Sequence, residues 1–162
     1  MTIFFVRYNP LALIRKPDMR KAFLTAASMI PLLLLASLAS ASDPLGRWKT
    51  IDDETGQAKS IVEISRASDG TLSGTVVEIL QSDKGPNPVC DECSGARKDQ
   101  PIQGMTILWG MSPKGDEWSG GTILDPAKGR TYRSKMQMHG EDRLGVSGCV
   151  AFICREQVWQ RE

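Results

Sequence analysis

Hydrophobic and polar residues alternate one by one through the C-terminal third of the chain. The clearest stretch is Thr131–Met138, where one set of alternate positions holds Tyr132, Ser134, Met136 and Met138 and the other holds Thr131, Arg133, Lys135 and Gln137. Residues 143–150 repeat the pattern after a turn at 139–142, and residues 118–124 precede a turn at 125–129. A period of two is typical of a strand with one buried face. We therefore predict an antiparallel three-stranded meander over residues 118–150.

The rest of the chain after residue 41 reads as more short strands. We expect strands at 46–50, 58–66, 71–80, 105–111 and about 155–161, separated by turns rich in Gly, Pro and Asp. Eight short strands joined hairpin after hairpin predict an all-β fold, and favour an eight-stranded antiparallel up-and-down barrel over a sandwich. The exception is the long loop Gln81–Pro101, which is too long for a plain connection and is expected to be functional or stapled.

The N-terminal segment has the organisation of a secretory signal peptide. Arg20 and Lys21 precede the apolar run Ala22–Leu38, and Ala39-Ser40-Ala41 follows as a small-x-small cleavage site. An uncleaved membrane anchor is the alternative, because the run is just long enough to span a bilayer, but Pro31 interrupts it. We predict a removable extension at 1–41, a single domain at 42–162, and a periplasmic or secreted protein.

Charge argues against two kinds of partner. The chain has 20 Lys and Arg and 19 Asp and Glu. Removal of residues 1–41 takes five basic residues and one acidic residue away, so 15 basic and 18 acidic residues remain. No basic stripe survives, and we expect neither nucleic acid nor an anionic membrane surface as a partner, and no stable membrane insertion after cleavage.

The four cysteines form two close pairs, Cys90-x-x-Cys93 and Cys149-x4-Cys154. An even count behind a signal peptide favours structural disulfides. Cys149 can bond Cys154 only if the chain turns at Val150–Ile153, as the following strand requires, and Cys90–Cys93 would tie the long loop to itself. Crossed disulfides, a tetrathiolate zinc site and a redox-active Cys90/Cys93 pair are the alternatives. An oxidising compartment disfavours the zinc site, and the missing strand-to-helix context disfavours the redox pair.

Both ends of the predicted domain carry a tryptophan and an arginine. Gly46-Arg47-Trp48 opens the first strand, and Trp159-Gln160-Arg161 closes the last. First and last strands are neighbours in a closed barrel, so we expect Arg161 to lie over the Trp48 ring. This arrangement resembles the lipocalin and wider calycin pattern, in which a Gly-x-Trp meets an Arg near the C-terminus. The alternative is two unrelated exposed residues.

A longer resemblance covers almost all of residues 42–162. Its motifs are Gly46-x-Trp48, Asn87-Pro88, Gly104-Met105-x-Ile107-Leu108-x-Gly110, Trp118-x-Gly120-Gly121-x-Ile123-x-Asp125-Pro126-x-x-Gly129-x-x-Tyr132 and Trp159-x-Arg161. Together they resemble an uncharacterised bacterial family, domain of unknown function 2147. The resemblance implies an exported, lipocalin-like β-barrel and brings no established activity. The paired cysteines look like those of one subset of the family.

A soft apolar lining is predicted for the inner face of the barrel. It consists of Tyr132, Met136 and Met138 with Trp109 and Met111. Methionine fills irregular space and adapts to varied ligands. An eight-stranded barrel has room for packed side chains or for one small ligand, so a filled core and a ligand cavity are both open.

No set of residues predicts catalysis. His139, the single histidine, lies in a tight turn without a serine or cysteine placed as its partner. Asp125 precedes Pro126 and is expected to accept backbone hydrogen bonds in its turn. Asp83 and Asp99 flank the long loop and are expected to be solvated rather than to bind a cation. We therefore predict no catalytic residue, no metal and no cofactor.

Three functions compete. The favoured one is a periplasmic binder of a small apolar or amphipathic molecule held in the barrel. The second is an envelope protein-interaction module with a filled core, acting through its surface or the 81–101 loop. The third is a thiol oxidoreductase using Cys90 and Cys93, which the missing structural context disfavours.

Overall fold

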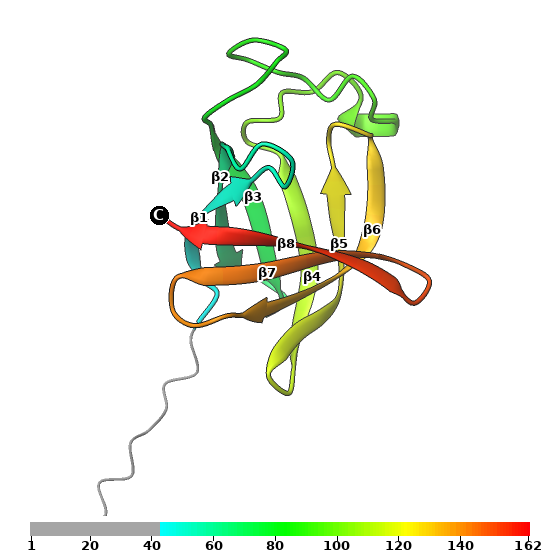
Figure 1. Cartoon of the computed structure of the whole chain (residues 1–162). Coiled ribbons are helices and arrows are strands. Elements are labelled where there is room, and N and C mark those ends of the chain that lie inside the picture. The colour runs from blue at the N-terminus through cyan, green and yellow to red at the C-terminus, as the bar shows by residue number, and fades with distance from the viewer. Residues whose placement is uncertain (1–42) are drawn as a thin grey trace, which may run out of the picture. The chain divides into compact units, whose positions relative to one another are not determined.

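Eight antiparallel strands close into a barrel in the computed structural model, which describes residues 43–162 (Figure 1). The strands are β1 (Gly46–Ile51), β2 (Ala58–Arg66), β3 (Leu72–Ile79), β4 (Thr106–Lys114), β5 (Glu117–Asp125), β6 (Arg130–Met138), β7 (Arg143–Val150) and β8 (Ile153–Arg161). Each strand pairs with the next in sequence, and β8 pairs with β1. The predicted up-and-down barrel is confirmed. The predicted signal peptide lies outside the described residues.

Apolar side chains fill the centre of the barrel. Among the strand residues of the core cluster, those exposed by at most 2 % are Trp48, Val62, Ile64, Leu72, Val76, Leu108, Met111, Met136, Leu144, Val146 and Trp159. A side chain this deeply buried has no room beside it for a water molecule, so this part of the interior is packed as protein cores usually are. Of the residues that the structure describes, none forms a helix long and apolar enough to cross a membrane.

Glycine bulges in β4 and β5 change which side chains face inward. Gly110 has a φ of 71°, and the pairing of β3 with β4 shifts beside it. Met111 is consequently buried inside the barrel. A Cβ on the facing Gly121 would lie 2.3 Å from the Met111 sulfur, so the two strands need a glycine there. The strand also runs further than predicted, to Lys114, because the hairpin tightens to a turn at Gly115-Asp116.

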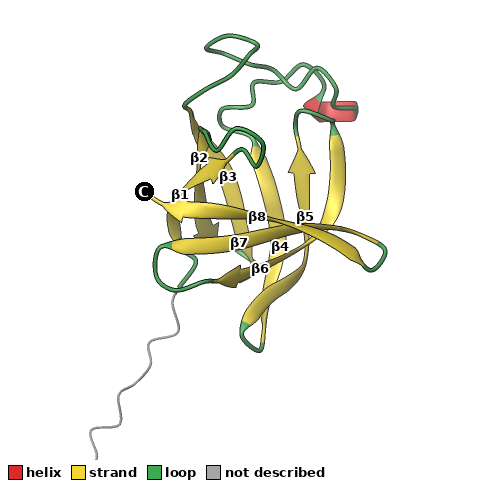
Figure 2. Ribbon diagram, viewed as in Figure 1, coloured by secondary structure: helices red, strands yellow, loops and turns green. Residues whose placement is uncertain are grey.

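The long loop between β3 and β4 lies against the outer face of the sheet and is stapled by a Cys90–Cys93 disulfide, as predicted. It contains a short 3-10 helix, Gly95–Arg97, drawn red in Figure 2. Both cysteines are buried and belong to the same apolar cluster as Ile107 and Leu124. The loop is therefore anchored to the apolar cluster that also contains the centre of the barrel.

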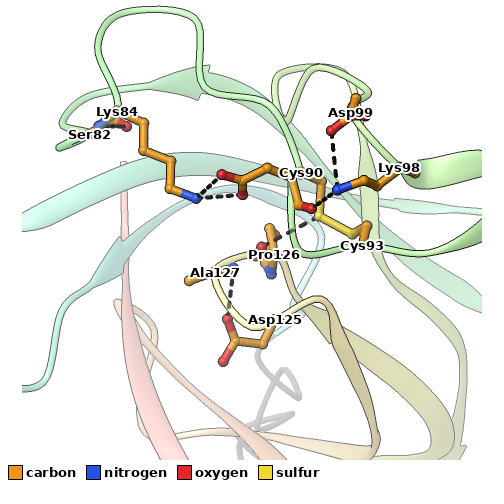
Figure 3. Close-up of polar contacts among 10 residues, drawn as sticks. Ser82, Lys84, Cys90, Cys93, Lys98, Asp99, Asp125, Pro126 and Ala127 are labelled. Atoms are coloured by element: carbon orange, nitrogen blue, oxygen red, sulfur yellow. Dashed lines mark hydrogen bonds and ion pairs between the residues drawn. A yellow bond between two sulfur atoms is a disulfide. The ribbon is translucent and has the colours of Figure 1, made fainter.

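The turn between β5 and β6 seats this loop (Figure 3). Gly129, with a φ of 60°, lies so close to it that a Cβ would come 1.9 Å from the carbonyl oxygen of Glu92. The Cys90 sulfur is 3.4 Å from the carbonyl oxygen of Pro126. Asp125 accepts a hydrogen bond of 3.1 Å from the amide of Ala127, which is the turn role expected for it. The Asp-Pro-x-x-Gly motif of the β5–β6 turn is thus the part of the barrel that the loop contacts closely here.

Candidate functional site

One end of the barrel is closed by Arg161. Its guanidinium lies 4.2 Å from the centre of the Trp48 ring. The same group donates hydrogen bonds to the carbonyl oxygens of Asp43, Leu45 and Glu141 at 2.8–3.1 Å. A planar guanidinium can stack and donate in several directions at once. The structure brings together the two residues that the lipocalin-like pattern singled out, and they serve closure rather than binding.

The other end of the interior is less filled. Here the inward-facing Ile123, Tyr132 and Gln157 are half-buried, in contrast to the fully buried layer below them. Gly148 lies among them with no side chain, and a Cβ on it would be 3.4 Å from the Cβ of Tyr132, an ordinary contact distance. This end carries the β1–β2 and β7–β8 turns and the long loop. The less filled end is therefore the one opposite Arg161.

The barrel wall is loosely closed beside this end. Within residues 43–162, β1 and β8 pair at only two positions, Trp48 with Arg161 and Lys49 with Gln160. Toward the β7–β8 turn the two strands separate. An ion pair between Arg155 of β8 and Asp53 of the β1–β2 turn, with a nitrogen-to-oxygen distance of 3.1 Å, lies on this side instead. Side chains rather than ladder hydrogen bonds join β8 to the β1–β2 turn here.

The five predicted lining residues do not form one surface. Met111 and Met136 lie in the filled centre, and Met138, half-buried, lies at the end of β6 beside the closed end. Tyr132 lies at the less filled end. Trp109 does not face the interior as predicted. It pairs with Thr122, which faces outward, and the bulge at Gly110 puts Trp109 and Met111 on opposite faces of the strand. Its ring is covered by Arg97 of the long loop, 4.7 Å from the ring centre.

A groove of about 560 Å³ lies on the outer face, between the β4–β5 and β7–β8 hairpins. Three cationic side chains line it together with one carboxylate, Glu117; the cations are Lys114, Arg133 and Lys135. The remaining lining includes Ser112, Ser119 and the disulfide of the β7–β8 hairpin. Sequence reasoning missed this site because its residues come from five strands, β4 to β8, and no local pattern gathers them.

The second predicted disulfide, Cys149–Cys154, joins facing positions at the end of β7 and the start of β8. All four cysteines are therefore paired locally, and the described residues hold no free thiol. This pairing rules out crossed disulfides and a tetrathiolate zinc site. Within residues 43–162 no other group of His, Cys, Asp and Glu is placed to hold a metal ion.

His139 pairs with a surface carboxylate. Its Nε2 lies 3.2 Å from an oxygen of Glu156, and both side chains are more than a third exposed. An exposed His–Glu pair of this kind is common on protein surfaces and contributes little to stability. This contact gives the single histidine of the sequence a surface ion-pair partner and does not indicate a catalytic role.

Closure by Trp48 and Arg161 in an eight-stranded up-and-down barrel defines a lipocalin-like fold. A solved structure supports this class: protein HP1028 from the human pathogen Helicobacter pylori, described as belonging to the lipocalin family, superimposes with a TM-score of 0.63. The two chains are 14 % identical over 74 % of this chain and 83 % of that one, which establishes the fold alone.

The chain belongs to the family described as uncharacterized protein conserved in bacteria, DUF2147, which matches residues 46–161. The match spans every strand of the barrel and the long loop. No curated protein matches the chain.

Proposed function

We propose that this protein is an exported binding protein that takes up a small amphipathic molecule at the less filled end of its barrel. One observation carries the proposal. The inner face changes from fully buried apolar side chains at the centre to half-buried Ile123, Tyr132 and Gln157 at that end, around Gly148, which has no side chain.

The chemistry of this end favours an amphipathic ligand over a purely apolar one. The Tyr132 ring and Ile123 offer apolar contact, and the phenol adds a polar group at the same place. The rim carries the charged pair Arg155 and Asp53. A molecule with an apolar body and a polar end would satisfy both parts of such a site.

The polar groups nearby support binding rather than catalysis. The hydroxyl of Thr50 is 2.8 Å from that of Ser60, and Gln157 accepts a hydrogen bond of 2.8 Å from the indole of Trp159. Groups engaged in this way stiffen the wall but are not poised as nucleophile or base. We therefore propose that the protein is not an enzyme.

Export is the second part of the proposal. The basic pair, the apolar run and the small-x-small site before residue 42 have the organisation of a cleaved signal. Two disulfides in a domain of this size are typical of an oxidising compartment. Both observations favour the periplasm or the outside of the cell.

Titration with an apolar fluorescent probe tests the binding site. We expect binding close to one probe per chain for the wild type. Gly148→Leu places a side chain in front of Tyr132 from a strand position without unusual φ, so it should block the probe while the barrel stays folded. Tyr132→Ala should keep the stoichiometry and change the affinity, because it removes a wall of the site.

A matched control is Gln137→Leu, which adds the same side chain to an exposed position on the outer face of β6. It should leave probe binding unchanged. Circular dichroism and the unfolding midpoint establish that each variant is folded. Equal binding by the wild type and Gly148→Leu would contradict a site inside the barrel, and would favour the surface-acting module instead.

A further inference from the structure

The turn between β7 and β8 presents three apolar side chains to solvent. Val150, Phe152 and Ile153 are exposed by 64, 92 and 70 %. The two strands pair to their last residues, Val150 with Ile153, so the hairpin extends beyond the body of the barrel (Figure 1). These three exposed side chains lie together on one turn, and Phe152 is the most exposed large apolar side chain of the described residues. Such a cluster marks an interaction site.

The hairpin is fixed in this exposed form. The Cys149–Cys154 disulfide joins the two strands immediately behind the tip. The guanidinium of Arg133 donates a hydrogen bond to the carbonyl oxygen of Ala151, the first residue of the turn. These two constraints oppose collapse of the tip onto the barrel, which would otherwise hide its apolar side chains.

Positive charge lies in the outer groove beside the hairpin, with Arg133 nearest to the tip. The outer groove, whose walls include Cys149, Ala151 and Cys154, holds the three cations Lys114, Arg133 and Lys135 against the single carboxylate of Glu117. Arg155, on the other face of β8, is paired with Asp53. The sequence has no basic stripe, and the local excess exists only because β4, β6 and the hairpin meet here.

We propose that this tip docks the protein on the surface of a lipid bilayer that contains anionic phospholipid. Phe152 and its two neighbours enter the edge of the acyl region, and the groove cations, with Arg133 nearest to the tip, face the anionic headgroups. The two residues beyond each cysteine reach about 7 Å, which matches the depth of about 5–10 Å at which interfacial segments lie. The docking is peripheral and independent of any ligand in the barrel.

A bilayer fits this surface better than a protein partner does. A stable protein interface buries about 800 Å² on each side, and three side chains on a single projecting turn supply only part of that. A membrane needs no complementary shape. It needs apolar groups that project and cations that flank them; the hairpin supplies the first and the neighbouring groove supplies the second.

Sedimentation with vesicles tests the proposal. The protein is produced from the whole coding chain and used as the expressing cells leave it, so any processing is common to all variants. We expect binding to equimolar phosphatidylcholine and phosphatidylglycerol, and much weaker binding to phosphatidylcholine alone. Phe152→Ser should weaken the binding at least about tenfold. Lys114→Gln and Lys135→Gln should each weaken it about fivefold.

Matched controls come from the same strands. Val158→Ser removes an exposed apolar side chain of β8 away from the tip, and Arg143→Gln removes a cation from the far end of β7. Neither should alter vesicle binding. A Phe152→Trp variant reports the tip directly, because lipids brominated on their acyl chains should quench it more than they quench the wild type.

Three outcomes would overturn the proposal. The first is equal vesicle binding by the wild type and Phe152→Ser. The second is no added quenching of Phe152→Trp by brominated lipid. The third is absence of vesicle binding together with a specific cross-link from position 152 to an envelope protein, which would assign the tip to a protein partner.

Discussion

Single residues close this barrel and seat its loop. Arg161 joins the C-terminal strand to the segment before β1 and to the β6–β7 turn through three carbonyl oxygens and the Trp48 ring. Gly129 acts by having no side chain, since the backbone of Glu92 occupies the place of its Cβ. Sequence motifs pointed to both residues, but the contact between Gly129 and the loop became visible only in three dimensions.

Replacing Arg161 tests closure. Arg161→Ala should lower the free energy of unfolding by about 1–2 kcal/mol, because the cation–π contact is lost and carbonyl oxygens lose their donor. Arg161→Lys should recover only part of this, since a single ammonium cannot stack and reach all three oxygens. Urea denaturation measures both. Denaturation midpoints equal to that of the wild type in both variants would show that the contact does not contribute to stability.

Replacing Gly129 tests the seat of the loop. Gly115→Ala is the matched control, because its φ of 62° is nearly the same and nothing lies within 4 Å of the added Cβ. The control should cost about 1–2 kcal/mol from backbone conformation. Gly129→Ala should cost about 2–4 kcal/mol, because overpacking adds to the same strain. Equal losses of unfolding free energy in the two variants would mean that the loop moves away from the added Cβ without destabilising the protein.

Elements differ in how well the alternating pattern predicted them. The pattern located all eight strands because one face of each is buried and a shift of one residue would expose it. It failed at Gly110, where a bulge turns Trp109 outward, and at the end of β7, where Val150 keeps the inward phase but has passed the edge of the barrel. Alternation indicates which face of a strand is buried. It indicates neither the bulges within the strand nor the point at which the neighbouring strands end.

The long loop should respond to acid through Asp91. A hydrogen bond from Lys84, 2.7 Å from its Oδ2, is the main cause that lowers the pKa of Asp91 below its ordinary value of 3.8. A lowered pKa contributes stability that is complete above 3.8 and is lost as the pH falls through the lower value. Amide exchange in residues 80–105 should therefore accelerate only in strong acid.

Asp91→Asn is the control for this effect. It removes the titrating group, so the acid dependence attributed to this contact should disappear while the protection at neutral pH decreases slightly, as expected for an exposed ion pair. An identical acid profile in the wild type and the variant would assign the effect to other carboxylates.

At the scale of the whole molecule, the fold class was predictable and the sites were not. Strand count, turn spacing and the Gly-x-Trp to Arg pattern together point to a lipocalin-like barrel. The cationic groove combines Lys114 of β4 with Arg133 and Lys135 of β6, and the total charge of the chain does not indicate it. How far the interior is filled depends on side-chain packing, which a period of two does not describe.

Export should leave a chain that begins at Ser42. Intact mass of protein from a periplasmic extract should correspond to residues 42–162 with both disulfides formed, because the small-x-small site ends at Ala41 and the compartment is oxidising. A chain that begins at Met1 or Met19 would contradict cleavage and would restore the membrane-anchor alternative.

The narrow pairing of β1 with β8 has a consequence for the timing of folding. Trp48 and Arg161 are in contact but lie near opposite ends of the domain's sequence. Their contact therefore closes the longest stretch of chain, and we expect it to form last. A polypeptide that crosses a membrane with its N-terminus first can make every hairpin as it emerges, but it must hold β1 unpaired on one side until its final residues arrive. We therefore expect the barrel of an exported chain to close only after β8 has emerged.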